Sequence, residues 1–322
     1  MEFVTNDVNA DVIGFGALNV DKLHTVDSIA SEDEESFIKS LKETPGGSAA
    51  NTVIGLAKLG HSVSLIGKIA EDDEGDLIEL NLAFNGVYTN NLIYAQEGNT
   101  GKVLGFVDDK GERCLYVDPG VNDDIKIEEI NPLFTYHCKI MHYTSFVGDS
   151  INAQIELLEK LNDETLLSFD PGVLYVKRGI KEIKPILDKT DILLINESEL
   201  KLLFEDYYKS IDNVDEITTK EIAMHVLDDG IKIVVVKQGS RGVYALNSEE
   251  ECQVNAFKCE PVDTTGAGDS FNSGFLHGLL NDYTLEESCK IGNWVASKSI
   301  CGFGMEAFPS KEDLEEFLNT KV

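Results

Sequence analysis

The sequence predicts a doubly wound α/β fold with a small β-strand lid, and three observations support this prediction. Apolar stretches typical of strands alternate with helical stretches over most of the chain. Several of these stretches, such as Ile192–Ile195 and Ile231–Val236, are continuously apolar, as expected for strands buried on both faces of a parallel sheet. Two segments break the alternation with short strand-like stretches, and these predict the lid.

The predicted elements follow one another in the order strand, helix, strand. Apolar or β-branched runs predict strands over Val12–Leu18, Val63–Ile69, Lys139–Tyr143, Leu166–Asp170, Ile192–Ile195 and Ile231–Val236. Helical stretches between them are expected near Ala49–Leu59, Asp76–Asn85, Asn152–Leu161, Ser198–Phe204 and Thr219–Asp228. After Ala267 the chain is predicted to be helical to its end, over residues 267–280, 284–300 and 310–318.

The lid is predicted from two segments that read as strands and turns. Residues Lys102–Val107 and Glu112–Val117 flank the turn sequence DDKGE, which contains Gly111, and this arrangement predicts a β-hairpin. The stretch from about Asp21 to Glu43 has the pattern of strands and a loop. We therefore expect lid segments at approximately residues 20–44 and 98–120, within a single domain that spans residues 1–322.

The length and composition are those of a folded protein with a sizeable core. A chain of 322 residues is long enough for one large α/β domain or two small domains. No stretch approaches about 18 consecutive apolar residues, so the sequence predicts no membrane-spanning helix. The first residues, MEFVTNDVNAD, lack the basic and apolar regions of a secretory signal, so we expect a cytoplasmic protein.

The charge and the cysteines argue against several kinds of partner. The formal net charge of −31 would repel polyanions, so nucleic acid and anionic membranes are not expected to bind. A solvated acidic coat, as in organisms with a salty cytoplasm, explains this charge. The six cysteines form no C-x-x-C pair, and we expect reduced, packed thiols rather than disulfides or a metal site.

The sequence DTTGAGDS at residues 263–270 carries the clearest chemical signal. It opens an apolar helix, and its small residues leave backbone N–H groups uncovered at the helix start. Such N–H groups, aligned with the helix dipole, favour a phosphate or a developing negative charge. Asp269, just after them, is placed to accept a proton from a hydroxyl nucleophile, as phosphoryl transfer requires. A Gly-rich loop with an Asp N-cap would explain the same residues without catalysis.

Two further segments predict contacts to a small polar ligand. The sequence PGGSAANT at residues 45–52 leads a Gly-Gly turn into a helix, where Asn51 could approach a ligand. Asn19 and Asp21 follow the first predicted strand and could hold two hydroxyls of a polyol. Each segment also has a structural explanation, as a helix entry or as an Asx turn. The chain contains no P-loop sequence, and the dinucleotide pattern G-x-G-x-x-G fails at Asn19.

These three segments, in this order, resemble the ribokinase-like (PfkB) family of carbohydrate and nucleoside kinases. GGSAAN with the downstream Gly60 resembles the N-terminal signature of the family, and DTTGAGDSFNSGFL resembles its C-terminal signature. The resemblance covers nearly the whole chain. It implies a three-layer αβα sandwich with a β-strand lid. It also implies a phosphotransferase that uses ATP and Mg2+ and has an alcohol group as acceptor.

The resemblance implies roles for individual residues. Asp269 would be the general base. An anion hole would be formed by the backbone of Gly266, Ala267 and Gly268. The hydroxyls of the substrate would be bound by Asn19, Asp21, Gly46, Gly47 and Asn51. In NESE, Asn196 and Glu199 match the N-x-x-E element, which holds the phosphates and, through water, Mg2+.

A nucleotide loop and a cation site follow from the same resemblance. KQGSRG is similar to the nucleotide loop of the family and contributes Lys237, Gly239 and Gly242. Lys237 stands where a threonine is common, and a lysine could replace its phosphate contact electrostatically. Asn293 would lie on the adenine side of the nucleotide. Asp263 and Thr265, with the backbone near Gly304, match a site for a monovalent cation such as K+.

Three polar residues outside these motifs have open interpretations. Asp170, in FDPG, ends a strand on the side of the cleft and would lie either near the magnesium or in a structural turn. His24 and His142 could approach the substrate, although a histidine beside a strand more often has a structural role.

The acceptor is the feature on which the sequence leaves most alternatives. YVDPGVN at residues 116–122 resembles the stretch between lid and sheet in ribokinases, which favours D-ribose. GGSAAN and FDPG also resemble archaeal nucleoside kinases, so phosphorylation of adenosine, cytidine or inosine is the alternative. A phosphosugar is less favoured because the lid segment shows no evident pair of basic residues, and 2-keto-3-deoxygluconate stays open.

Two questions about the whole molecule also stay open. A non-catalytic sensor that binds a sugar or a nucleotide would belong to a different class of protein, and the presence of Asp269 argues against it, since a mere binder needs no general base. By family habit a homodimer would form through the lid strands, and a monomer fits the sequence too.

Overall fold

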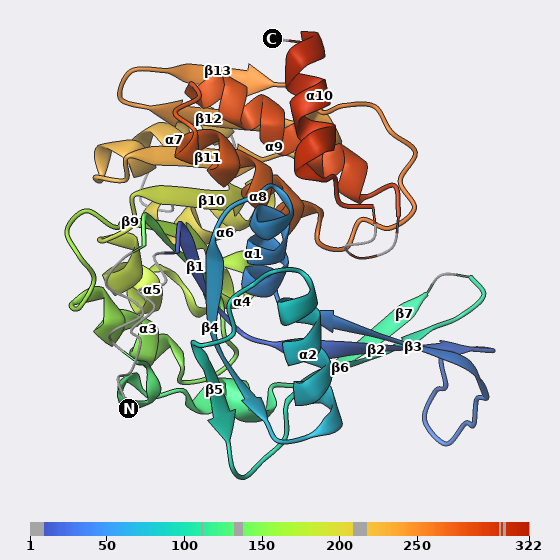
Figure 1. The fold of residues 1–322 in the computed structure, drawn as a ribbon. Coiled ribbons are helices and arrows are strands. Elements are labelled where there is room, and N and C mark those ends of the chain that lie inside the picture. Colours follow the sequence, from blue (N-terminus) through green and yellow to red (C-terminus); the bar gives the residue numbers. More distant parts are fainter. Residues whose placement is uncertain are drawn as a thin grey trace.

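Two β-sheets organise this computed structural model, which describes residues 10–110, 112–131, 138–208, 218–302, 304 and 307–321. In that part of the chain the larger sheet has nine strands, in the order β13-β12-β11-β10-β9-β8-β1-β4-β5 (Figure 1). Their bounds are β1 Val12–Phe15, β4 Val63–Ala70, β5 Leu92–Ala95, β8 Ile140–Thr144, β9 Leu166–Asp170, β10 Ile192–Asn196, β11 Ile233–Lys237, β12 Val243–Asn247 and β13 Glu251–Val254. Neighbouring strands pair in parallel, except that β12 pairs antiparallel with both β11 and β13 at one edge.

Helices cover both faces of this sheet (Figure 1). One face packs against α1 Ser48–Lys58, α2 Asp73–Phe84, α8 Ala267–Leu280 and α9 Leu285–Ser299, and α10 Lys311–Lys321 packs on α9. The other face packs against α3 Ile151–Leu158, α4 Gly172–Arg178, α5 Ile180–Leu187, α6 Glu197–Tyr208 and α7 Thr219–Asp228. The predicted three-layer αβα sandwich is therefore confirmed.

The central strands are buried on both faces, as their continuous apolar sequences predict. All eight residues of β4 are buried, and Leu193 and Leu194 of β10 have no exposed surface. β1 lies between β4 and β8. After β1 the larger sheet is extended on one side by β4 and β5, and then on the other side by β8 and the later strands, so the strand order reverses at β1. Open α/β sheets bind ligands at such a switch point, beyond the carboxyl ends of the strands.

A second sheet of four strands, in the order β3-β2-β6-β7, projects from the larger sheet and forms the predicted lid (Figure 1). Its strands are β2 Asn19–Val26, β3 Ile38–Gly46, β6 Gly101–Val107 and β7 Arg113–Asp118. β2 pairs in parallel with β6 and antiparallel with β3, which places Asn19 opposite Gly46. The predicted hairpin is that of β6 and β7, and its turn residue Gly111 lies outside the described residues.

The structure differs from the prediction at a few elements. β1 ends at Phe15 rather than Leu18, because the chain leaves the sheet at Gly16, where a side chain would overlap with the Thr144 hydroxyl. The prediction omitted β5, β12, β13, α4 and α5. β5 and β13 have four residues each, and elements of this length give weak periodic patterns. None of the helices in the described ranges is long and apolar enough to cross a membrane.

Candidate active site

Asp269 lies in the first turn of α8, at the carboxyl end of the larger sheet. The helix begins after Gly266, whose φ of 73° is in the left-handed region that favours glycine. Of the three residues predicted to form the anion hole, Ala267 already donates its N–H to the Thr264 carbonyl at 3.2 Å. The start of α8 therefore presents the small residues and the helix dipole that an anion requires, with one N–H engaged in the turn.

Asn51, from the start of α1, contacts Asp269 directly. Its Nδ2 donates to Asp269 Oδ2 at 2.9 Å. The chain enters α1 through Gly47, whose φ is 124° and where a side chain would overlap with the Ala17 carbonyl oxygen. Two helices that begin at glycines thus bring two predicted site residues, far apart in the sequence, into hydrogen-bond contact.

The surroundings of Asp269 shift the pKa of its carboxyl group toward neutral pH. Burial, with a smaller contribution from the negative charge of Asp170, raises the pKa of Asp269 to about 7. The hydrogen bonds from Asn51 and Ser48 and the positive charge of Lys237 act in the opposite direction. A carboxylate with a pKa near the working pH is suited to take a proton from a hydroxyl and later release it.

Asn19 and Asp21 form a polar wall at the base of the lid. Asn19 Nδ2 donates to Asp21 Oδ1 at 2.7 Å. Both face Gly46 on β3, where a Cβ atom would lie 3.2 Å from Asp21 Oδ2 and 3.3 Å from Asn19 Nδ2. Burial raises the pKa of Asp21, and the Asn19 contact opposes this rise. The lid thus supplies an amide and a carboxyl group, with which the hydroxyls of a small polyol can exchange hydrogen bonds.

Asn196 and Glu199 cap the start of α6, directly after β10, with reciprocal hydrogen bonds. Glu199 N donates to Asn196 Oδ1 at 2.9 Å, and Asn196 N donates to Glu199 Oε2 at 3.1 Å. Burial and the negative charge of Asp170 raise the pKa of Glu199. The hydrogen bonds with Asn196 and the positive charge of Lys237, which pairs with Asp170, act in the opposite direction. A divalent cation prefers oxygen ligands, and Glu199 and Asn196 supply a carboxylate and an amide oxygen at one helix start. Glu199 therefore fits the predicted role in holding Mg2+ through water.

Lys237, at the end of β11, forms a network that the sequence did not predict. Its Nζ donates to Asp170 Oδ2 at 2.6 Å and to Asn272 Oδ1 at 3.2 Å. Asn272 Nδ2 in turn donates to Asp170 Oδ2 at 2.7 Å. Asp170 is therefore the ion-pair partner of Lys237 rather than part of a simple turn. Asn272 was missed, although a polar residue within the apolar helix sequence FNSGFLHGLL was an available signal.

The other residues predicted for the nucleotide surround the end of β13. Asn293 Nδ2 donates to the carbonyls of Val254 at 3.0 Å and of Asn255 at 3.2 Å. A side chain at Gly242 would overlap with the same Val254 carbonyl. Gly239 begins the short turn that precedes Gly242. The amide nitrogen of Asn293 thus holds the backbone on this side of the site.

The structure brings the residues of the predicted cation site together. Asp263 Oδ1 accepts the N–H of Thr265 at 2.9 Å, and a backbone hydrogen bond from Gly304 also reaches this carboxylate. Burial raises the pKa of Asp263, but the contacts to Thr265 and Gly304 outweigh it, so that the pKa lies below its usual value. Through these hydrogen bonds, the Asp263 carboxylate stabilises the loop before α8.

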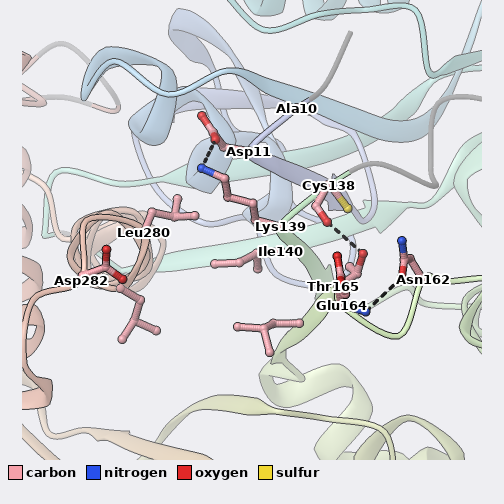
Figure 2. A pocket seen from close by; sticks show the side chains of 12 residues that line it. Ala10, Asp11, Cys138, Lys139, Ile140, Asn162, Glu164, Thr165, Leu280 and Asp282 are labelled. Carbon is pink, nitrogen blue, oxygen red and sulfur yellow. Dashed lines mark hydrogen bonds and ion pairs between the residues drawn. The ribbon is translucent and has the colours of Figure 1, made fainter. Parts of the chain in front are cut away.

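A separate pocket of about 620 Å³ lies at the opposite edge of the sheet (Figure 2). It is lined by residues at the starts of β1, β8 and β9 and by the end of α8. Its polar groups bind one another, as in the pairs Lys139–Asp11 at 2.9 Å and Thr165 Oγ1 to the Cys138 carbonyl at 2.8 Å (Figure 2). Because it is at the amino ends of the strands, it is distinct from the site around Asp269.

Comparisons with known proteins show the family and the fold of this chain. A family model described as pfkB family carbohydrate kinase matches residues 9–312. A protein of Archaeoglobus fulgidus, described as an uncharacterized sugar kinase, is 38% identical over 265 residues, which are 81% of this chain and 100% of that protein. An ATP-dependent ribose-1-phosphate kinase of Halopiger xanaduensis is 29% identical over 310 residues, which are 96% of this chain and 98% of that protein. A crystal structure of ribokinase from Thermotoga maritima matches with a TM-score of 0.82 and 26% identity, over 96% of this chain and 99% of that one.

Proposed function

The chain belongs to the pfkB family of carbohydrate kinases, which are phosphotransferases acting on sugar hydroxyl groups, and we propose that its acceptor is the hydroxymethyl group of D-ribose, phosphorylated by ATP. The observation that carries this proposal is the contact between Asn51 and Asp269, and the polar wall made by Asn19 and Asp21 supports it. A base with a pKa near 7 and a group of side chains that can bind hydroxyls are what such a transfer needs.

The proposed mechanism is a direct in-line transfer without a covalent enzyme intermediate. Asp269 takes the proton of the attacking hydroxyl, while the start of α8 and the ammonium of Lys237 stabilise the negative charge of the transferring group. Glu199, together with Asn196, would hold Mg2+ through water, and this ion would supply further charge neutralisation at the β- and γ-phosphates. Asp263 and Thr265 remain the proposed site for a monovalent cation such as K+.

The base of the lid holds a pair of lysines that the sequence analysis did not identify, but nearby carboxylates engage both, and this arrangement supports a neutral acceptor. Lys22 on β2 and Lys102 on β6 both contact Glu74 of α2, at 2.7 Å and 3.2 Å. Lys22 also contacts Glu43, at 2.8 Å. A second phosphate would have to compete with these carboxylates for the two ammonium groups. Ribose 1-phosphate is nevertheless the second candidate, because the Halopiger xanaduensis relative carries that activity in its name.

The lid also supports a proposed homodimer. Phe37 and Ile38, at the start of β3, are 75% and 57% exposed. Exposed apolar side chains at the end of an edge strand favour contact with a second copy of the lid.

Release of ADP with Mg2+ and ATP, measured separately for each acceptor, tests the proposed function. The acceptors are D-ribose, ribose 1-phosphate, adenosine, cytidine and inosine, and Asp269→Asn is the control variant. We expect turnover on D-ribose and at least a hundredfold less in the control. Turnover on a nucleoside alone would contradict the proposed acceptor, and binding of an acceptor without ADP release would indicate a non-catalytic sensor.

A further inference from the structure

We propose that Asp170 and Asn272 are positioning residues, which hold the Lys237 ammonium beside the start of α8 so that it binds the γ-phosphate of ATP. This inference rests on the proposed kinase function and names the residues that place its phosphate-binding cation. The three side chains come from β9, α8 and β11, which are separate elements of the fold.

The geometry aims the ammonium at the predicted anion site. A Cβ atom at Gly268, in the first turn of α8, would lie 3.5 Å from Lys237 Nζ. Asp170 and Asn272 take two of the three N–H donors of the ammonium, at 2.6 Å and 3.2 Å. The lysine therefore lies against the backbone that faces the transferring group, and two side chains fix its position.

The burial of this ion pair calls for a functional explanation. The side chains of Lys237 and Asp170 are only 15% and 11% exposed. Removing both charges from water is costly, and buried ion pairs are often no more stable than apolar residues of similar size. Lys237 brings a full positive charge into this site, and Asp170 balances that charge.

His142, on the same face of the sheet, does not supply this balance. It is fully buried, its Nδ1 lies 3.0 Å from Ser168 Oγ, and its Nε2 has no hydrogen-bond partner among the described residues. Burial lowers the pKa of His142 to about 4, so the imidazole is neutral at physiological pH. Asp170 therefore receives its positive partner from Lys237.

The first test compares the affinities for two nucleotides, measured by calorimetry with Mg2+ and without any acceptor. The non-hydrolysable ATP analogue AMP-PNP has a γ-phosphate and ADP has none. Lys237→Met should weaken AMP-PNP binding at least tenfold and change ADP binding less than twofold. Lys232→Met is the matched control, since Lys232 also forms an ion pair from this strand region, 2.7 Å from Asp191, and should change neither affinity.

Asp170→Asn separates positioning from a simple effect of charge. Removing a nearby negative charge would by itself strengthen the binding of a polyanion. If Asp170 positions Lys237, the variant should instead weaken AMP-PNP binding about threefold or more. Stronger AMP-PNP binding in Asp170→Asn, or equal changes for AMP-PNP and ADP in Lys237→Met, would overturn the inference. Because no acceptor is present, failure of sugar phosphorylation would be a separate result.

The pH dependence of turnover gives an independent second readout. Asp170 raises the pKa of Asp269 and Lys237 lowers it, while the neighbouring donors Asn51 and Ser48 are unchanged in both variants. The midpoint of the pH–rate profile should therefore move down in Asp170→Asn and up in Lys237→Met. Asp170→Asn/Lys237→Met should return it close to the original midpoint. Shifts in the same direction, or none in variants that remain folded by circular dichroism, would contradict the proposed arrangement.

Discussion

The start of α8 and the lid sheet differ in how firmly their residues are held. Around α8, Asp269, Asp170 and Lys237 each have partners from other elements of the sandwich. In the lid, five of the six residues of β7 are exposed, and the ion pair of Lys39 with Asp109 lies at the surface. In the proposed function, phosphoryl transfer would therefore depend on the packed frame, whereas the choice of acceptor would depend on an element with few packed neighbours.

This difference has a physical basis in what each region buries. The strands beneath α8 lie between two helical layers, so moving a side chain there disturbs a packed core. A four-stranded sheet that projects from the body can change its angle at a smaller cost, and such elements open first in folded proteins. Closure of the lid over the acceptor would exclude water from the transferring group.

The largest effect that separates the two regions is expected from a lid residue of the site. Asp21→Asn keeps the shape of the side chain but removes a charged hydrogen-bond acceptor, which contributes about 1.5–3 kcal/mol. We expect kcat/KM for the acceptor to fall about tenfold to a hundredfold, with the affinity for AMP-PNP unchanged. An equal loss of AMP-PNP affinity would show that acceptor binding by the lid and nucleotide binding by the frame are not separate.

An effect on stability rather than on turnover is expected from a matched pair of lysines. Lys68 on β4 is 5% exposed and contacts Asp124 at 2.6 Å and Glu129 at 2.8 Å, so Lys68→Met should lower the free energy of unfolding by about 1.5–3 kcal/mol. Lys39→Met breaks the ion pairs of an exposed lid lysine with Asp27 and Asp109 and should leave the melting temperature unchanged. Chemical denaturation of both variants checks this contrast. Equal losses of unfolding free energy in the two variants would contradict it.

Much of the fold and part of the site could be predicted from the sequence. Leu166–Asp170 and Thr219–Asp228 have the predicted bounds, because a buried strand and a capped amphipathic helix have strong local patterns. Asn51 and Asp269 were predicted from separate motifs, and the structure brings them into contact. Local sequence signals work where one short segment determines the geometry.

Contacts between distant segments could not be predicted in this way. The ion pair of Asp170 and Lys237 joins two strands with β10 between them, and no short motif contains both residues. The edge strand β13 was missed because it has four residues and is only partly buried. The neighbouring strand β12 was missed although it is almost fully buried and begins with the apolar run Val243–Leu246. Such features depend on the order of strands in the sheet, which a single sequence does not state.

The titration of Asp269 should affect the activity and the stability of the protein in opposite directions as the pH rises. Because its folded pKa of about 7 lies above the ordinary value of 3.8, the folded state keeps a proton that the unfolded chain loses between these values. The stability that Asp269 contributes is therefore present below about pH 4 and is lost as the pH rises to about 7. Activity should rise over the upper part of this range, since the carboxylate is the base.

The turnover of Asp269→Asn on the best acceptor, measured at pH 8 beside its melting temperature, tests the role of this base most directly. We predict a loss of about a hundredfold to ten-thousandfold in kcat, with a melting temperature equal to or above that of the unmodified chain. Turnover close to that of the unmodified chain, in a variant shown to be folded, would contradict the assignment of Asp269 as the catalytic base.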